Sequence, residues 1–111
     1  MSALDKARKH FAAFKRQKIE VPEWEMDLYF DPLTLAQIRK VKDVSEQVGR
    51  AKILLEYVKD ADGSPVFPDV PEPDMIKAVA EELDPIITGR IAEAVLARRE
   101  PGEMVDDMGK P

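Results

Sequence analysis

Side chains that could carry out chemistry are scarce in this sequence of 111 residues. His10 is the only histidine, and there is no cysteine. Thiolate catalysis, disulfide bonds and cysteine-rich zinc sites are therefore excluded, and a metal site would have to be built mainly from carboxylates. Because His10 lies between Lys9 and Phe11 in a basic segment, we interpret it as a structural or surface histidine.

The carboxylates offer one candidate cation site, at Asp60-Ala61-Asp62-Gly63. The calcium loop of an EF-hand needs oxygen ligands at alternate positions, a glycine at the sixth position and a glutamate at the twelfth. Counted from Asp60, the glycine falls fourth and Pro71 falls twelfth. The pattern does not match, so the segment is better interpreted as a turn.

Acid–base catalysis has no clear candidate either. The adjacent pairs Glu81-Glu82 and Asp106-Asp107 lie in polar stretches that offer nothing to bury them, whereas a general acid at neutral pH usually needs burial. The sequence has no glycine-rich phosphate loop and no nucleophile motif. We therefore expect a protein that is not an enzyme and has no metal or cofactor.

Charge is unevenly distributed along the chain. The net charge is −5, but residues 1–20 carry +4 and residues 60–111 carry −8. This polarity is compatible with end-specific contacts or head-to-tail association of copies, but two solvated faces of opposite sign are the favoured interpretation. The cations of the basic end could also meet nucleic-acid phosphates. However, the whole chain is acidic and no known nucleic-acid-binding motif appears, so nucleic acid is the less favoured partner. These cations are Lys6, Arg8, Lys9, Lys15, Arg16 and Lys18.

Composition bounds the size of the core. Apolar residues make up 44% of the chain and charged residues 35%. A chain this short and this highly charged can bury only a small hydrophobic core, which a partner or a second copy could complete. Residues 1–10 do not resemble a secretory signal, and no apolar run approaches the roughly 20 residues of a membrane span. We expect a cytoplasmic protein without a membrane partner.

Hydrophobic periodicity predicts a mainly α fold with four to five short helices and a small β-hairpin. Leu4, Ala7, Phe11 and Phe14 form one stripe of the first expected helix. We expect one helical domain over residues 1–100 and a mobile acidic tail over residues 101–111. The expected helices span residues 3–17, 35–42, 45–59, 75–83 and 85–99, and a single bent helix over residues 35–59 is the alternative for the second and third.

The hairpin is expected over about residues 18–30. Apolar and polar residues alternate from Trp24 to Asp31, residues 19–21 supply a second strand, and Pro22-Glu23 makes the turn. Because a lone hairpin is marginal in water, its apolar face must pack on helices or on another subunit. Its residues are therefore either core or partner-binding. The candidate partner-binding residues are Trp24, Met26, Leu28, Phe30 and Phe67.

Capping signals place the helix ends. Thr34 and Gln37 form a capping box, and Asp43 or Ser45 caps the next helix. Gly49 within that helix is either a close-packing point or a weakness. Residues 60–73 form a proline-rich loop in which Val66 and Phe67 are expected to contact the core. Asp74 is expected to cap the fourth helix and Asp84, followed by Pro85, the fifth.

Two segments together resemble a known family. They are VPEWEMDLYFDPLT (residues 21–34) and AKILLEYVKDADGSPVF (residues 51–67). They are similar to the small tail assembly chaperones of long-tailed bacteriophages and prophages. The shared features are an extended segment with a tryptophan, a Pro-Leu-Thr helix start, an Asp-x-Asp-Gly turn, and a Pro-x-Phe segment that precedes two short helices. In this sequence these features are Trp24, Pro32-Leu33-Thr34, residues 60–63, Pro65-Val66-Phe67 and the helices between residues 74 and 99.

The resemblance implies a helical chaperone that binds the tape measure protein and keeps it soluble before the tail tube polymerises around it. It implies the tape measure protein as partner, with the tail tube protein and further copies of the chain as additional candidates. It also implies action in the host cytoplasm and absence from the finished virion. A structural tail component and a nucleic-acid-binding regulator that uses the basic helix are the alternatives.

Overall fold

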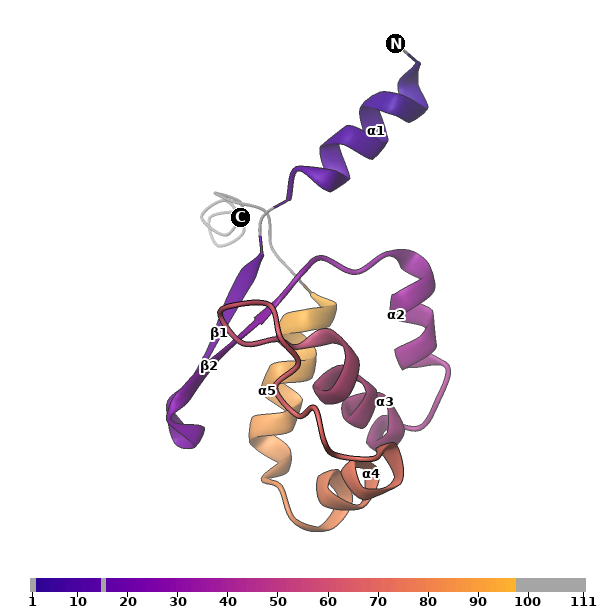
Figure 1. The fold of residues 1–111 in the computed structure, drawn as a ribbon. Coiled ribbons are helices and arrows are strands. Elements are labelled where there is room, and N and C mark those ends of the chain that lie inside the picture. The colour runs from indigo at the N-terminus through magenta and orange to yellow at the C-terminus, as the bar shows by residue number, and fades with distance from the viewer. Residues whose placement is uncertain (1, 15, 98–111) are drawn as a thin grey trace, which may run out of the picture.

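The computed structural model describes residues 2–14 and 16–97. A helix, α1 (Ala3–Ala12), precedes the hairpin of β1 (Gln17–Val21) and β2 (Met26–Phe30). The helical body follows, with α2 (Leu35–Lys42), α3 (Glu46–Lys52), α4 (Glu72–Glu81) and α5 (Pro85–Leu96). Figure 1 shows α1 projecting from one end of the molecule, while the hairpin lies beside the helical body. The predicted mainly α fold with a small hairpin is confirmed.

α1 is shorter than the sequence predicts. Ser2 caps it by accepting a hydrogen bond from the Asp5 amide, and Asp5 suits the positive end of the helix dipole. The helix ends at Ala12 rather than near Gln17, because Gln17 already pairs with Phe30 in the sheet. None of the ten residues of α1 is buried. Its apolar stripe therefore does not join the core.

The hairpin is antiparallel, with Ile19 opposite Leu28 and Val21 opposite Met26. The sequence prediction placed Trp24 in the second strand, which is wrong. A 3₁₀ turn, η1 (Pro22–Trp24), joins the strands, and Glu25 follows it in the left-handed region at φ 56°. Alternation of apolar and polar residues alone could not reveal this, because Trp24 has the spacing expected of the strand face although it belongs to the turn.

The start of the helical body follows the predicted signals. The Thr34 hydroxyl accepts from the Gln37 amide, and the Gln37 side chain accepts from the Thr34 amide, which completes the capping box. Ser45, rather than Asp43, caps α3. α2 and α3 are therefore separate helices. A Cβ at Gly49 would lie 2.7 Å from the Val41 carbonyl oxygen, so Gly49 is a close-packing point between them.

The third predicted helix was expected to run as one α-helix to Lys59, and this is wrong. It changes to a π-helix, η2 (Ile53–Tyr57), in which the Val58 amide donates to the Ile53 carbonyl 3.1 Å away. Lys59 is then extended and bridges Tyr29 of β2 and Pro65. In the π-helix Ile53 and Leu54 are buried and Leu55 is half-buried. Before it, Val48 is half-buried and Val44, which precedes α3, is exposed.

The last two helices differ from prediction at their ends. α4 begins at Glu72 and has Pro73 in its first turn, so Asp74 lies within the helix and is not its cap. Proline is tolerated there because first-turn amides have no partner within the helix. Ala80, near the end of the helix, is exposed. Asp84 caps α5 as predicted, and Pro85 occupies its first turn. α5 ends at Leu96, before the expected Arg99, and the predicted tail over residues 101–111 lies outside the described residues.

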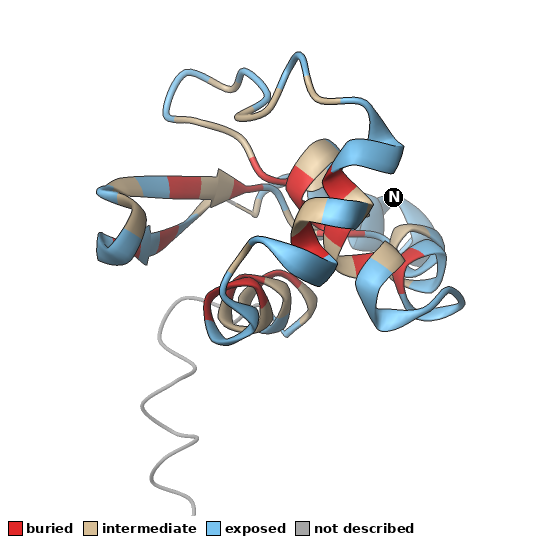
Figure 2. Ribbon diagram, turned by 90° about the horizontal axis from the view of Figure 1, so that it is seen from below, coloured by how far each residue is buried: buried red, intermediate tan, exposed pale blue. Residues whose placement is uncertain are grey.

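One core joins the hairpin to the helices. In Figure 2 buried positions, coloured red, occur on both the hairpin and the helices of the body. Val66 and Phe67 of the long loop are half-buried and pack against this core, as predicted. The buried apolar residues are Ile19, Val21, Leu28, Phe30, Leu33, Val41, Ala51, Ile53, Leu54, Val58, Met75, Val79, Ile87, Ile91 and Val95.

Candidate partner-binding surfaces

The hairpin residues predicted to bind a partner divide into two groups. Leu28 and Phe30 are 0% and 1% exposed and belong to the core, so a partner can reach neither without opening the fold. Trp24, Met26 and Phe67 are half-buried. These three residues remain the accessible part of the predicted surface, and their role in binding stays a prediction.

An edge-to-face ring contact joins the hairpin turn to the long loop. The rings of Trp24 and Phe67 lie 6.5 Å apart at 88°. Aromatic pairs prefer this geometry because the positive edge of one ring meets the negative face of the other. The loop residue Phe67 thus contacts Trp24 of the hairpin turn, and both residues keep part of their surface open to solvent.

A charged pair fixes the hairpin turn against α5. Arg90 donates from both terminal nitrogens to the two carboxylate oxygens of Glu23, at 3.0 and 2.6 Å. The hydrogen bonds from Arg90 hold the pKa of Glu23 below its usual range. The ionised pair therefore orients η1, although both side chains are solvent-exposed and the contribution of the pair to stability is modest.

A second ion pair closes the open end of the hairpin. Arg16 donates from Nε to Asp31, 2.9 Å away, and this bond lowers the pKa of the carboxyl group. Arg16 was predicted as one of six cations on a basic segment that could meet phosphates. It lies beyond α1 and is engaged by Asp31, whereas Lys6, Arg8 and Lys9 lie on α1 itself.

An apolar hollow lies between α2, α3 and α5, and the sequence did not indicate it. It has a volume of about 480 Å³, within the range of ligand pockets. Val44 on its rim is 38% exposed. No single segment signals such a site, because its lining comes from three helices. The lining residues are Val41, Lys42, Val44, Glu46, Gly49, Arg50, Ile53, Ala92 and Leu96.

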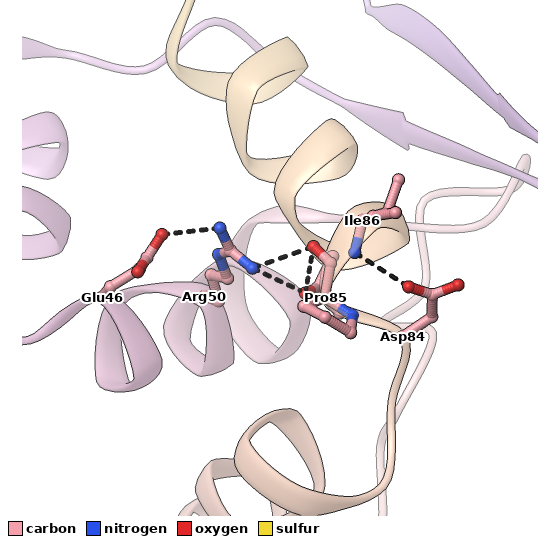
Figure 3. A network of polar contacts seen from close by, with 6 residues as sticks. Glu46, Arg50, Asp84, Pro85 and Ile86 are labelled. Atoms are coloured by element: carbon pink, nitrogen blue, oxygen red, sulfur yellow. Dashed lines mark hydrogen bonds and ion pairs between the residues drawn. The ribbon is translucent and has the colours of Figure 1, made fainter.

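Arg50 joins α3 to the start of α5 beside this hollow (Figure 3). It donates to the Pro85 carbonyl at 3.0 Å, to the Thr88 hydroxyl at 3.1 Å and to the Glu46 carboxylate at 2.6 Å. Among the residues that the structure describes, Thr88 is the buried polar one, and its hydroxyl accepts from Arg50 and donates to the Pro85 carbonyl at 3.4 Å. This side of the hollow is therefore held in a fixed shape.

The acidic turn at residues 60–64 is held together by hydrogen bonds from its own backbone. Asp60 accepts hydrogen bonds from the amides of Asp62 and Ser64, both at 3.1 Å, and Asp62 accepts from Ser64 at 2.9 Å. The carboxylates are thus occupied by their own backbone, and the predicted turn is confirmed. Within residues 2–14 and 16–97, no group of three potential ligand side chains could hold a metal ion. No helix in this part of the chain is long and apolar enough to cross a membrane.

Comparison with known proteins gives one similarity. No protein-family model matches the sequence, and no curated protein sequence matches it. Among solved structures, the bacteriophage HK97 tail assembly chaperone is similar, with a TM-score of 0.50 and 20% sequence identity. The similarity covers 83% of this chain and 96% of that chain. The chain therefore has the fold of a bacteriophage tail assembly chaperone, as the resemblance in its sequence predicts.

Proposed function

We propose that this protein is a tail assembly chaperone that binds the tape measure protein of a long-tailed phage or prophage and keeps it soluble. The observation that carries the proposal is the fold shared with the HK97 tail assembly chaperone over nearly the whole of that chain. Fold alone does not fix function. Here it agrees with the family resemblance of the sequence around Trp24 and over residues 60–67.

A holding chaperone needs accessible apolar surface for its client and a charged exterior that keeps the complex soluble. Both features are present. Trp24 and Phe67 are half-buried at the hairpin turn, Val44 opens the hollow, and charged residues make up 35% of the chain. We assign the client contact to Trp24 and Phe67. In this proposal the protein acts in the host cytoplasm and is absent from the finished virion.

Co-expression with the tape measure protein of the same phage or prophage tests the proposal. We expect the tape measure protein to become soluble and to co-purify with the chaperone. Trp24→Ser/Phe67→Ser should lose the client, whereas Leu35→Ser, which changes a residue 67% exposed on α2, should keep it. If only Val44→Asp loses the client, the contact lies at the hollow instead. If the client stays insoluble with the wild-type chain, the function is wrong.

The nucleic-acid alternative rests on α1, which is basic and has no buried residue. A gel shift that weakens with salt would support a regulator, because phosphate contacts release counterions. Lack of binding at low salt would remove this alternative. The third possibility, a structural tail component, requires the chain to be present in purified virions.

A further inference from the structure

The hollow between α2, α3 and α5 has an apolar lining that is accessible at its rim. Val41 and Ile53 lie at its base and are buried, whereas Leu96 is half-buried and Val44 is 38% exposed. Its volume of about 480 Å³ leaves room for a few apolar side chains. The hollow can therefore accept a short peptide segment.

The charge around the hollow is positive on the side of α2. Lys42 lines the hollow, and Arg39 and Lys40 lie in the same last turn of the helix. All three side chains are exposed, and none forms an ion pair among the residues that the structure describes. The other two charged residues of the lining, Glu46 and Arg50, neutralise each other at 2.6 Å. The rim thus favours an occupant that carries negative charge beside its apolar side chains.

The sequence that follows α5 has this complementary composition. α5 ends at Leu96, which itself lines the hollow, so the chain leaves the helix at the edge of the hollow. Residues 100–108 include four acidic residues and no cation, and Met104, Val105 and Met108 supply apolar side chains. Methionine suits an irregular apolar space, because its side chain is unbranched and flexible.

The connection from α5 is long enough for this segment to return to the hollow. Met104 follows Ala97 by seven residues, and an extended chain spans about 3.3–3.6 Å per residue, so the two can lie up to about 24 Å apart. Between them lies Pro101-Gly102, a dipeptide that is typical of turns. A turn there directs the following residues back toward the helical body.

We propose that residues 103–108 dock in the hollow of their own chain. Met104 and Met108 cover the apolar lining, while the carboxylates of Asp106 and Asp107 face Lys42. The docked segment needs little intrinsic affinity, because a short connection holds it at a high effective concentration. It also closes the hollow to other ligands until it leaves. This proposal does not depend on the proposed function.

A pair of introduced cysteines tests the proposal in the whole chain, which has no cysteine of its own. In Val44→Cys/Met104→Cys, docking brings the two thiols together, and a disulfide needs Cα atoms about 4.4–6.8 Å apart. The control is Leu35→Cys/Met104→Cys, because Leu35 lies on α2, is 67% exposed and does not line the hollow. With oxidised glutathione, we expect the first variant to form its intrachain disulfide about tenfold faster than the control, or more.

Charge reversal in the first cysteine variant tests the ionic part of the contact. Lys42→Glu should slow disulfide formation about tenfold, because like charges then face each other. Further addition of Asp106→Lys/Asp107→Lys should restore the rate, since the reversed charges complement each other. Lys6→Glu makes the same change of charge at an exposed position on α1, and it should leave the rate unchanged.

Three results would overturn the proposal. Equal rates in the two cysteine variants would leave the hollow to a separate acidic partner. A disulfide between chains, seen as a product of twice the 12.5 kDa of one chain, would assign the hollow to the segment of a second copy. A rate that Lys42→Glu does not change, or that the reversed aspartates do not restore, would remove the ionic contact on which the docking depends.

Discussion

Replacement of Gly49 by alanine sets two effects of opposite sign against each other. Alanine is favoured over glycine within a helix by about 1 kcal/mol. The new Cβ would lie 2.7 Å from the Val41 carbonyl oxygen and 3.2 Å from Val41 Cγ1. Overpacking costs about 1–3 kcal/mol, and the upper end applies because a backbone atom cannot rotate away. We therefore expect Gly49→Ala to lower the free energy of unfolding by about 2 kcal/mol.

Thermal and urea unfolding measured by circular dichroism would test this. A loss of about 2 kcal/mol corresponds to roughly 8–16 °C in melting temperature for a domain of this size. Gly89→Ala is the matched comparison in α5, since its Cβ would lie 3.1 Å from a terminal nitrogen of Arg50, a side-chain atom that can shift at the cost of weakening its hydrogen bond to Glu46. Its melting temperature should fall less than that of Gly49→Ala. A Gly49→Ala protein as stable as the wild type would refute the reasoning that close packing outweighs helix propensity here.

Three further changes have expected outcomes. Asp84→Ala removes the side chain that accepts from the Ile86 amide at the start of α5, and urea unfolding should report a loss of about 0.5–2 kcal/mol. Phe30→Ala should cost about 3–5 kcal/mol, because this ring is 1% exposed, and the same titration measures it. The Glu23–Arg90 pair should make stability depend on pH. The pKa of Glu23 is lowered in the folded state, so the unfolded state binds the proton more readily. The stabilisation is therefore present above the ordinary glutamate pKa of about 4.3 and is lost as the pH falls through the lower folded-state pKa. In Arg90→Gln the pH dependence of the urea midpoint should flatten in that range.

The features that sequence predicts well are those completed by nearby residues. The Thr34–Gln37 capping box and the Asp84 cap each join residues no more than three apart. The hairpin follows from alternation on both sides of a turn that contains proline. Such local signals need no knowledge of the rest of the fold, which is why they survive in the structure.

The features that sequence misses depend on residues far apart in the chain. The α-helix expected over residues 45–59 changes to a π-helix at Ile53, and Lys59 just beyond it bonds to Tyr29, thirty residues earlier. α1 ends early because Gln17 pairs with Phe30. In both cases a distant strand competes with the local helical period, and the pairing overrides it.

The binding surfaces show the same division. Trp24 and Phe67 were identified from their size and from the motifs around them. The hollow beside Val44 could not be predicted, because Val41, Ile53 and Leu96 come from three helices. The carboxylate pair of Glu20 and Asp27 depends on strand register, since these residues become neighbours only when the hairpin pairs. A sequence lists these charges but does not place them opposite each other.

The helix α1 lies outside the apolar core of the fold. A helix of ten residues is shorter than the 12–15 or so that are marginally stable alone in water, and packing of an apolar face normally supplies what is missing. Ser2 contributes a cap worth about 1 kcal/mol, but no residue of α1 is buried. The apolar core is complete without it, because the buried residues fall between Ile19 and Val95. Substitutions on the exposed face of α1, such as at Leu4, should therefore leave the melting temperature of the helical body unchanged.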